Sequence, residues 1–452
     1  MDISELYSIF AEHPVVTTDS RDCPEGSVFV ALKGASFNGN KFAAAALEKG
    51  CAWAVVDEAE HAGGEHTILV DDCLKTLQQL ARYHRRRLGT PIVGITGTNG
   101  KTTTKELTAA VLARKYNVLC TQGNFNNDIG VPKTLLRINA GHDIAVVEMG
   151  ASHPGDIKTL VDIVEPDCGL ITNVGRAHLQ GFGSFEGVLR TKGELYDFLR
   201  TRSDSVTFVN AGDEHLTSIT GGLTHIMKYG RGDCGSNRTG GGALAPAAEG
   251  VRIVGETVCC DPFLKFRWYE RDDDGQPVDG IHEVHTNLIG SYNLDNMLAA
   301  IAVGRHFDVP SADISKALSA YTPSNNRSQL TVTKSNRLIV DAYNANPTSM
   351  AAAIDNFSNM EAEGKMAILG DMGELGEASA AEHAKIVRQL EDCGLNDVWL
   401  VGSEFAKTGC RYRKFQNVDE VKAEITANGP ENRTILIKGS HSTGLYMLPE
   451  IL

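Results

Sequence analysis

The 452-residue sequence lacks an excess of positive charge and a long apolar run. Lys and Arg number 43 against 57 Asp and Glu, which gives a formal net charge of −14. This balance argues against general binding to nucleic acid or to anionic membranes, because both need a basic surface. It leaves room for an anionic ligand in a local positive pocket. No apolar stretch approaches about 18 residues, so no membrane-spanning helix is expected.

The ten cysteines are scattered and include no C-x-x-C pair. We therefore expect neither a zinc site nor a disulfide framework, because both usually need clustered cysteines. The opening residues 1–13 carry three acidic side chains and no basic segment followed by an apolar one. The sequence thus predicts no signal peptide and a cytoplasmic location. At roughly 100–200 residues per domain, the length predicts two to four domains.

Short apolar, β-branched segments alternate with longer segments of helical periodicity along most of the chain. Each short segment ends in Gly, Asn, Asp or Ser, where a strand-to-helix turn falls in a parallel sheet. The predicted strands are residues 92–96, 144–150, 169–175, 206–211, 337–343, 366–371 and 434–440. The alternation predicts an α/β fold with a mostly parallel sheet, and residues 261–286 are predicted to contain a hairpin.

The pattern divides the chain into three domains at residues 1–86, 87–310 and 311–452. The first ends in the basic run ARYHRRRLG at residues 81–89, which is either a solvated helix face or an interdomain hinge. The second carries a glycine-rich loop, and the third has its own alternation of strands and helices.

The strongest functional signal is GITGTNGKTTTKE at residues 94–106, between a predicted strand and a predicted helix. Loop amides at this place surround phosphate oxygens, with a lysine on the β- and γ-phosphates and a hydroxyl on Mg²⁺. The spacing departs from the strict G-x-x-x-x-G-K-[ST] pattern, because Ile95 stands where that pattern has glycine. A structural glycine turn is the alternative. The predicted nucleotide-binding residues are Gly97, Thr98, Asn99, Gly100, Lys101, Thr102 and Thr103.

Charged side chains after two other predicted strands are candidates to complete a phosphoryl-transfer site. Glu148 ends an apolar strand at the same edge of the sheet as the loop, although a capping or surface acid is the alternative. His178 follows another strand and is a second candidate metal ligand, although an isolated histidine is more often not a ligand. Lys192, taken alone, is an ordinary helical lysine.

Two further polar loops are candidates to hold a substrate. Residues 121–138 place amides and a carboxylate in a glycine-bounded loop, although capping and turn roles are the alternative. Residues 340–350 place polar groups after a strand, before a helix that Pro347 can start. Arg327 lies near the seam of the last two domains, where it either closes on a triphosphate or forms a surface ion pair. The polar groups of the two loops are Asn124, Asn126, Asn127, Asp128, Asp341, Tyr343, Asn344 and Asn346.

Together these motifs resemble the Mur ligases, the ATP-dependent amide ligases that build the peptide stem of the peptidoglycan precursor. The segments that carry the resemblance are, in chain order, GITGTNGKTTTKE, VVEMGAS, NVGRAHLQGFGS, TKGE, GSYNLDNMLAA and VDAYNANP. The resemblance implies an N-terminal UDP-sugar-binding α/β domain, a central P-loop ATPase domain and a C-terminal Rossmann-like domain. It is closest to the members that join D-alanyl-D-alanine to UDP-N-acetylmuramoyl-tripeptide (UDP-MurNAc-tripeptide) through an acyl phosphate.

The resemblance also implies roles for individual residues. Thr102, Glu148 and His178 match the metal ligands, and Lys192 matches a lysine that several members carry as a carbamate. Asn293 and Asn296 match the adenine-side motif. Arg327 matches the nucleotide-contacting arginine, and Asp341 matches the ribose-contacting acid. The implied catalytic residues are Lys101, Glu148, His178 and Lys192. The implied substrate residues are Ser20, Arg21, Asn124, Asn127, Asp128, Tyr343, Asn344 and Asn346.

The match to the family has one clear departure, because His441 in the KGSHS motif stands where members often have arginine. The D-N-P-R motif of the diaminopimelate-adding members is absent. The implied ligands are ATP, Mg²⁺, UDP-MurNAc-tripeptide and D-alanyl-D-alanine, and the implied state is a monomer that binds no nucleic acid. Alternatives are a P-loop GTPase or regulatory ATPase, a nucleotide-binding scaffold without turnover, and a Mur ligase for another amino acid.

Overall fold

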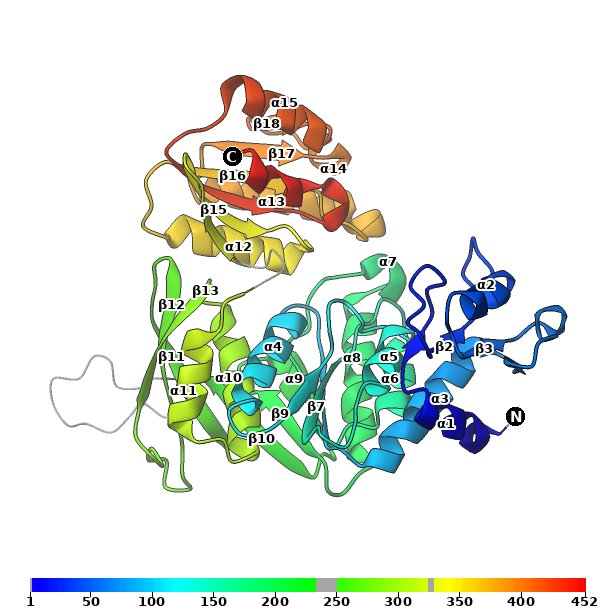
Figure 1. Cartoon of the computed structure of the whole chain (residues 1–452). Helices are drawn as coiled ribbons and strands as arrows, with labels where there is room; N and C mark the ends of the chain where they lie inside the picture. Colours follow the sequence, from blue (N-terminus) through cyan, green and yellow to red (C-terminus); the bar gives the residue numbers. More distant parts are fainter. Residues whose placement is uncertain (1, 233–249, 324–328) are drawn as a thin grey trace.

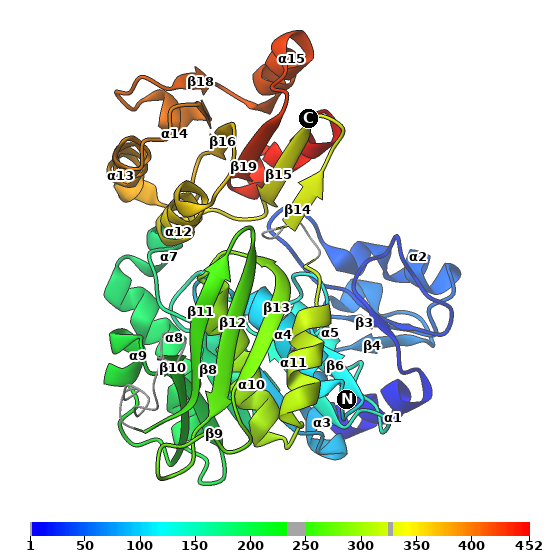
Figure 2. The same ribbon diagram turned by 90° about the vertical axis from the view of Figure 1, so that its left-hand side faces the viewer.

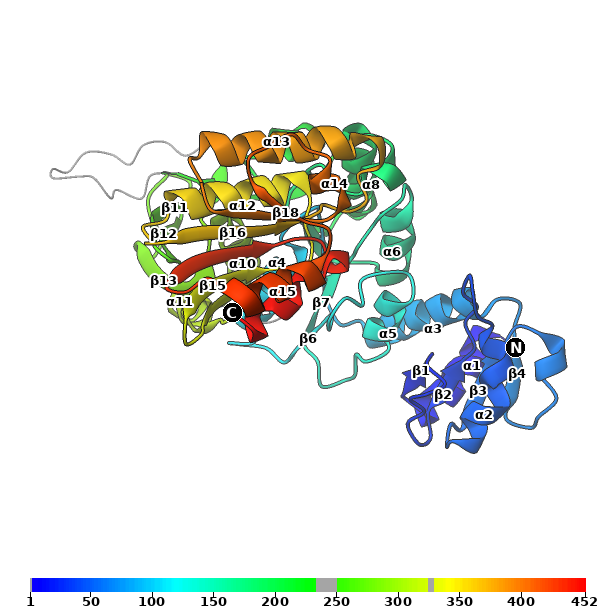
Figure 3. The ribbon, with the colours of Figure 1, turned by 90° about the horizontal axis from the view of Figure 1, so that it is seen from above.

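The computed structural model describes residues 2–232, 250–323 and 329–452. Three β-sheets follow one another along the chain, and helices flank each of them (Figure 1). The third sheet lies above the central sheet in this view, and the first sheet lies to one side. From above, the N-terminal sheet projects away from the other two (Figure 3). Arg327, the predicted nucleotide-contacting arginine, lies outside the described residues.

The N-terminal sheet has four parallel strands in the order β1-β2-β3-β4. Its central strands are short and apolar, and Phe29 and Val55 are buried, as expected of parallel strands. The strands are β1 (Val16–Thr17), β2 (Val28–Val30), β3 (Trp53–Val56) and β4 (Thr67–Leu69). The helices are α1 (Ile3–Glu12), η1 (Gly39–Phe42), α2 (Ala43–Glu48), η2 (Ala59–His61) and α3 (Cys73–Leu88).

Helix α3 fastens the N-terminal sheet to the central domain. The basic run at its C-terminal end is solvated only in part, because Arg86 and Arg87 are exposed whereas His84 and Arg85 are buried. His84 donates from Nε2 to the carbonyl of Ile138 at 2.8 Å, and Arg85 pairs with Asp167 at 2.7 Å. Both partners belong to the central domain, so the basic residues join the two domains. The predicted boundary at residue 86 falls in the last turn of this helix.

The central sheet has nine strands in the order β13-β12-β11-β10-β9-β8-β5-β7-β6. The strands from β6 to β11 are parallel, and β11, β12 and β13 are antiparallel (Figure 2). The antiparallel pair β12–β13 confirms the predicted hairpin. The strands are β5 (Ile92–Thr96), β6 (Val118–Cys120), β7 (Ile144–Glu148), β8 (Cys168–Ile171), β9 (Val206–Asn210), β10 (His225–Arg231), β11 (Val251–Cys260), β12 (Phe263–Glu270) and β13 (His282–Ile289).

Helices cover both faces of the central sheet, which explains why strands β5, β7 and β8 are buried at every position. In β5, Val93 and Ile95 contact the core formed with α4 and α10, whereas Ile92 contacts the core formed with α6 and α8. The helices of this domain are α4 (Lys101–Leu112), α5 (Gly130–Leu135), α6 (Asp156–Val164), α7 (Leu179–Phe182), α8 (Phe185–Arg200), α9 (Glu214–Ser218), α10 (Asn293–His306) and α11 (Ser311–Ala320).

The C-terminal sheet has six strands in the order β14-β15-β19-β16-β17-β18, of which only β14 is antiparallel among the described residues. The strands are β14 (Gln329–Val332), β15 (Asn336–Asp341), β16 (Lys365–Gly370), β17 (Val398–Val401), β18 (Arg413–Phe415) and β19 (Arg433–Lys438). The helices are α12 (Pro347–Asn359), η3 (Gly376–Ala378), α13 (Ser379–Asp392), α14 (Ser403–Ala406), α15 (Val418–Asn428), η4 (His441–Thr443) and η5 (Leu445–Glu450).

Helix α11 packs on β13 and α4 of the central domain. Trp268 of the central sheet donates from Nε1 to the Ser315 hydroxyl of this helix at 3.2 Å. The predicted boundary at residue 310 separates α11 from these partners, so we propose that the third domain begins between α11 and β14.

The architecture confirms the predicted α/β fold with three domains and mostly parallel sheets. The seven predicted strands correspond to β5, β7, β8, β9, β15, β16 and β19. Among the helices of the described residues, none combines the length and the apolar character needed to cross a bilayer.

Candidate active site

A cleft of about 1410 Å³ lies where the carboxyl ends of the central strands face the C-terminal sheet. Ligands of open α/β sheets bind at this edge, because the strand ends and helix N-termini meet there. The central domain supplies one wall of the cleft with the loop after β5, and the C-terminal domain supplies the other wall with the loops after β15, β16 and β19.

Two glycines shape the loop after β5. Gly97 has a φ of 141°, and a Cβ atom there would lie 2.0 Å from the Thr172 hydroxyl. Gly100 has a φ of 78° and begins α4, and its Cβ atom would lie 2.5 Å from Oδ1 of Asn296. Any larger residue at either position would strain the backbone and collide with a neighbour. The loop therefore needs glycine at both places.

The loop is held by side chains that follow β8. Asn173 accepts the amide of Asn99 at its side-chain oxygen (3.0 Å) and the amide of Thr98 at its carbonyl (2.9 Å). The Lys101 ammonium curls back over the loop and donates to the carbonyls of Gly97 (2.9 Å) and Thr98 (3.0 Å). A cation over a glycine-rich loop at the start of a helix is an arrangement that binds phosphate groups.

Glu148 supplies a buried carboxylate beside this loop, with only 1% of the residue exposed. Its oxygens accept from the Thr102 hydroxyl at 3.0 and 3.2 Å and from the Asn126 amide at 2.8 Å. No basic side chain pairs with Glu148 among the described residues. A buried carboxylate needs a compensating charge, and carboxylate and hydroxyl oxygens are ligands that Mg²⁺ prefers. Thr102 and Glu148 therefore fit the predicted metal site.

His178 begins α7 in the left-handed region, with a φ of 50°. Its Nδ1 atom forms an ion pair with the Glu374 carboxylate of the C-terminal domain. Burial lowers the pKa of His178, Glu374 raises it, and Lys101 and Lys192 lower it further. Within the described ranges, no three His, Cys, Asp or Glu ligand atoms gather around Glu148 or His178. The metal-ligand role of His178 stays a prediction.

Lys192 lies in α8 with 2% of the residue exposed. Its Nζ atom lies 5.6 Å from the centre of the Phe182 ring. Burial lowers the pKa of Lys192 well below its usual value, and Lys101 lowers it further, against the opposing effect of Asp156 and Glu194. A lysine in this environment favours the neutral amine, which is the nucleophilic form.

Asn293 and Asn296 are buried beneath the loop and line the cleft. Asn296 accepts from the Thr104 hydroxyl at 3.1 Å and donates to Asn293 at 2.9 Å. Asn293 in turn donates to the carbonyl of Ile289 at 2.8 Å. The two amides thus fasten α4 to α10, whatever contact they make with a ligand.

Asp341 and Lys438 stand side by side at the ends of the parallel strands β15 and β19. The Lys438 side chain is 1% exposed and forms an ion pair with the Asp341 carboxylate, which is 20% exposed. The ammonium also donates to the carbonyl of Asn344 at 3.4 Å. The buried cation therefore holds the predicted ribose-contacting acid at the cleft.

Aromatic rings form the neighbouring part of this wall. Tyr343 and His441 stack with an interplanar angle of 13° and a centroid distance of 6.2 Å. His441 also contacts the Tyr446 ring at a centroid distance of 4.7 Å. The residue that departs from the family pattern is therefore held between two tyrosines at the cleft.

Asn346 connects the two walls directly. It caps α12 by accepting the amide of Ser349 at 2.9 Å. Its own amide donates to Oδ1 of Asn99, in the glycine-rich loop, at 2.7 Å. One side chain thus starts a helix of the C-terminal domain and touches the phosphate-binding loop of the central one.

Comparisons with known proteins agree with this arrangement. Three family models match the chain in order: the Mur ligase family catalytic domain at residues 14–85, the Mur ligase middle domain at residues 95–304 and the Mur ligase glutamate ligase domain at residues 326–441. The UDP-N-acetylmuramoyl-tripeptide–D-alanyl-D-alanine ligase of Bacillus subtilis is 36% identical over 399 residues, which cover 86% of this chain and 79% of that protein. The chain belongs to the Mur ligase family.

Further Mur ligases extend the similarity to almost the whole chain. The Escherichia coli protein with the same name as the Bacillus relative is 30% identical over 436 residues, covering 95% of this chain and 91% of its own. A crystal structure of MurF from Acinetobacter baumannii has a TM-score of 0.83 at 30% identity, covering 96% and 92%. MurF ligase from Thermotoga maritima in complex with ADP has a TM-score of 0.82 at 25% identity, covering 97% and 96%.

The loop after β6 reaches the cleft of this Mur ligase, where Asn124, Asn127 and Asp128 line it. Asn127 accepts the amide of Gly130 at 2.8 Å, so its side-chain oxygen also has the capping role that was the alternative. The predicted residues of this loop are therefore at the cleft, and the contacts they make with a substrate stay a prediction.

Ser20 and Arg21 do not line the cleft. They lie in a turn after β1, where the Arg21 side chain is 87% exposed and pairs with Asp19 at 2.8 Å. The carbonyl of Ser20 accepts from the Lys49 ammonium at 2.7 Å. Their predicted role in binding the UDP sugar would require the substrate to extend from the cleft to the N-terminal domain.

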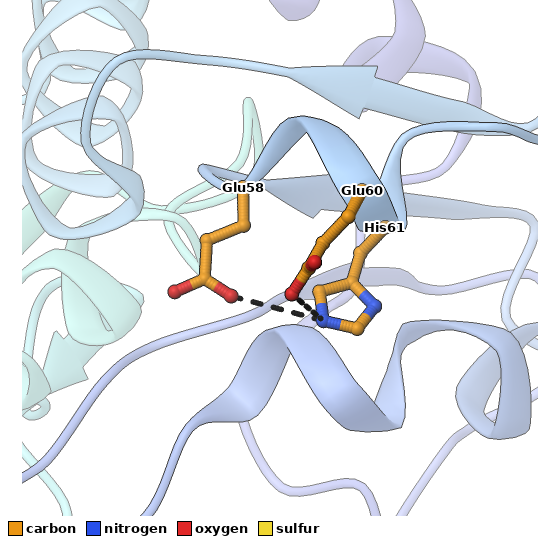
Figure 4. A group of neighbouring side chains, drawn as sticks. All are labelled: Glu58, Glu60 and His61. Atoms are coloured by element: carbon orange, nitrogen blue, oxygen red, sulfur yellow. Dashed lines mark ion pairs between the residues drawn. The ribbon is translucent and has the colours of Figure 1, made fainter.

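A second group of possible metal ligands lies in the N-terminal domain (Figure 4). The Nε2 atom of His61 lies 3.7 Å from Glu58 and 3.5 Å from Glu60. Glu58 also accepts from the Asn38 amide at 2.8 Å and lies 3.7 Å from the Lys33 ammonium. Because Glu58 already has partners and Glu60 is mostly exposed, we assign no metal to this group.

The sequence prediction missed two residues of the site, Asn173 and Glu374. Glu374 comes shortly after the predicted strand 366–371, whereas Asn173 lies within the predicted strand 169–175 and follows the end of β8 at Ile171. A search of the polar residues that follow each strand would have included them, because the loops after parallel strands meet at one edge.

Proposed function

We propose that this Mur ligase uses ATP to join D-alanyl-D-alanine to UDP-MurNAc-tripeptide, which gives the pentapeptide precursor of peptidoglycan. The observation that carries the proposal is the two-walled cleft. A phosphate-binding loop with Lys101 lies on one wall, and the loops of a separate domain close the other. The curated relatives named above for this activity cover most of the chain, which supports the same reaction here.

The reaction needs an activated carboxylate, because a free carboxylate is a poor electrophile. In the first step, an oxygen of the tripeptide carboxylate attacks the γ-phosphorus of ATP, the bond to the β-phosphate oxygen breaks, and ADP leaves. In the second step, the dipeptide nitrogen attacks the acyl carbon, and inorganic phosphate leaves with the electron pair of the broken C–O bond. Of the two protons lost by the ammonium, one ends on the phosphate and one in solvent.

The central wall carries the charge stabilisation that the first step needs. Two anions must approach each other, so the Lys101 ammonium and the amide protons at the start of α4 reduce their repulsion. Thr102 and Glu148 would hold Mg²⁺, with His178 as a further ligand once it leaves Glu374. The bound Mg²⁺ supplies further neutralisation of the phosphate oxygens.

A carbamate on Lys192 is a second part of the proposal. The neutral Nζ amine, favoured by burial, would add to the carbon of CO₂ and release one proton. The carbamate would be an anion in place of a neutral amine, near His178 and Lys101, and it could serve as a metal ligand. The burial of Lys192 supports this modification, because it favours the neutral amine. An ammonium has no free electron pair and could not react with CO₂.

The C-terminal wall would place the nucleotide and exclude water. Asp341, which pairs with Lys438, would contact a ribose hydroxyl, and Asn346, which donates to Asn99, would hold the loop of the central domain. Acyl phosphates hydrolyse readily, so a closed wall protects the intermediate. We further propose a monomer in the cytoplasm, where ATP and the UDP-linked substrate are available.

The test is phosphate release from ATP with UDP-MurNAc-tripeptide, measured with and without D-alanyl-D-alanine. We expect release to depend on both substrates and one amide product to form per phosphate. Release that ignores the dipeptide and follows a single amino acid would assign the protein to another reaction of the family. Release without any peptide substrate would favour a simple ATPase.

A further inference from the structure

Glu374 reaches from the C-terminal domain to the reacting end of the cleft. It lies in the loop between β16 and η3, in the left-handed region with a φ of 60°, and its carboxylate pairs with His178. The carbonyl of Glu374 also accepts the amide of Gln180 at 3.3 Å. Its side chain remains 63% exposed toward the cleft that it lines. The contact therefore holds a carboxylate near the active site without burying it.

The charges around this point matter for the second substrate. The α-amino group of a dipeptide has a pKa of about 7.7–8.0, so it arrives mostly as an ammonium. Lys101 lines the same cleft as His178 and Glu374, and its ammonium would repel that of the dipeptide. The site attracts ATP and the tripeptide carboxylate, which are anions, in the first step. It therefore needs an anionic group to bind the dipeptide ammonium in the second step.

Most other carboxylates of the cleft already have partners. Glu148 accepts from Thr102, and Asp341 pairs with Lys438. Asp156 accepts the amides of Ser152 and His153, Asp213 caps α9, and Asp295 pairs with Arg231. Glu374 differs from them because its partner, His178, is proposed to become a ligand of Mg²⁺.

We propose that Glu374 is the residue that binds the ammonium of the acceptor dipeptide and directs its nitrogen toward the acyl phosphate. The inference rests on the proposed function and adds a residue to its second step. If His178 serves as a metal ligand, the Glu374 carboxylate would be free to bind the incoming ammonium, which would lose one proton to solvent before its nitrogen attacks. Because Glu374 belongs to the C-terminal domain, the amine would be delivered only when that domain closes on the cleft.

Glu374→Gln tests the charge while keeping the size and a polar contact with His178. We expect it to raise the KM for D-alanyl-D-alanine by about 10- to 100-fold, as for loss of a charge-assisted hydrogen bond, with the KM values for ATP and UDP-MurNAc-tripeptide unchanged. Hydroxylamine, a nucleophile that is neutral at pH 7.5, should trap the acyl phosphate at the wild-type rate. Glu377→Gln removes an exposed carboxylate from the same loop and should change none of these values.

Arg176→Gln separates amine binding from domain docking. Arg176 pairs across the same domain contact with Glu382 at 3.2 Å. If this variant raises the KM for the dipeptide as much as Glu374→Gln does, Glu374 is only a docking contact and the inference is wrong. The inference would also be wrong if Glu374→Gln lost as much activity with hydroxylamine as with the dipeptide. If the wild type shows no dipeptide-dependent phosphate release, the proposed function fails instead.

Discussion

The two walls of the cleft are built in different ways. The phosphate-binding part of the central wall comes from one continuous segment, residues 98–103, with Glu148 beside it. The C-terminal wall comes from three loops, after β15, β16 and β19, that are distant in sequence. Its groups are held by one another, as Asp341 is held by Lys438. The difference suggests that the central wall carries the phosphoryl chemistry and the C-terminal wall carries orientation and closure.

The largest expected effect comes from the central wall. Lys101→Ala should lower kcat about 1000-fold, because it removes the cation that stabilises the transferring phosphoryl group. The melting temperature should change little, since the loop carbonyls of Gly97 and Thr98 that accept from this side chain can be satisfied by water. Lys316→Ala, at an exposed lysine of α11, is the matched control. Near-normal turnover by Lys101→Ala would assign the chemistry to another part of the cleft.

Lys192→Met should lower activity about 100-fold, since it removes the amine that would carry the carbamate. Lys192→Ala activity should recover in part with a short carboxylate such as acetate, which can take the place of the missing anion. Lys192 would be structural if Lys192→Met kept full activity.

The same substitution has a measurable effect on the pH dependence of stability. The folded state lowers the pKa of Lys192 below its usual value of 10.5. Between the two pKa values the unfolded state binds the additional proton, so the free energy of unfolding rises as pH rises through this window. In CO₂-free buffer, Lys192→Met should flatten that rise between neutral and alkaline pH. An unchanged slope would mean that the ammonium is well solvated in the folded protein.

On the C-terminal wall, Lys438→Met should act on nucleotide binding more than on chemistry. It leaves the Asp341 carboxylate without its partner, which should raise the KM for ATP about tenfold and lower the free energy of unfolding by about 2 kcal/mol. Lys438→Arg should restore part of both. A drop in kcat with unchanged KM would contradict the division between the two walls.

Asn346→Ala should have the smallest effect. It removes a helix cap and the contact with Asn99, which together stabilise the C-terminal domain and its contact with the central domain by about 1 kcal/mol. Asn417→Ala removes a cap from α15 outside the cleft and serves as the control. Both variants should lose similar stability, but only Asn346→Ala should raise the KM for ATP, by about threefold. Equal kinetics in the two variants would mean that the interdomain amide contact has no role in catalysis.

The sequence predicted the α/β class, the seven strands quoted above and the phosphate-binding loop, because these depend on local patterns. The loop was recognisable since strand, glycines and helix follow one another within residues 92–112. The pairing of Lys438 with Asp341 was not predicted, because it depends on the order of strands in the sheet. The burial of His84 and Arg85 was not predicted either, because their partners come from the next domain.

Residues that act across domains were the hardest to predict. Glu374 approaches His178 only because β16 and β8 end at facing edges of two sheets. No spacing in the sequence indicates the contact between Glu374 and His178. The resemblance to the Mur ligases supplied residue roles that the local patterns could not, such as those of Lys192 and Asn293.

The acyl phosphate proposed for this enzyme can be detected by following an oxygen atom through the reaction. UDP-MurNAc-tripeptide labelled with ¹⁸O in both oxygens of its terminal carboxylate is incubated with the protein, ATP and D-alanyl-D-alanine, and the phosphate is analysed by mass spectrometry. An acyl phosphate formed at the Lys101 loop predicts that each released phosphate carries one ¹⁸O atom. Phosphate released with amide product but without the label would contradict it.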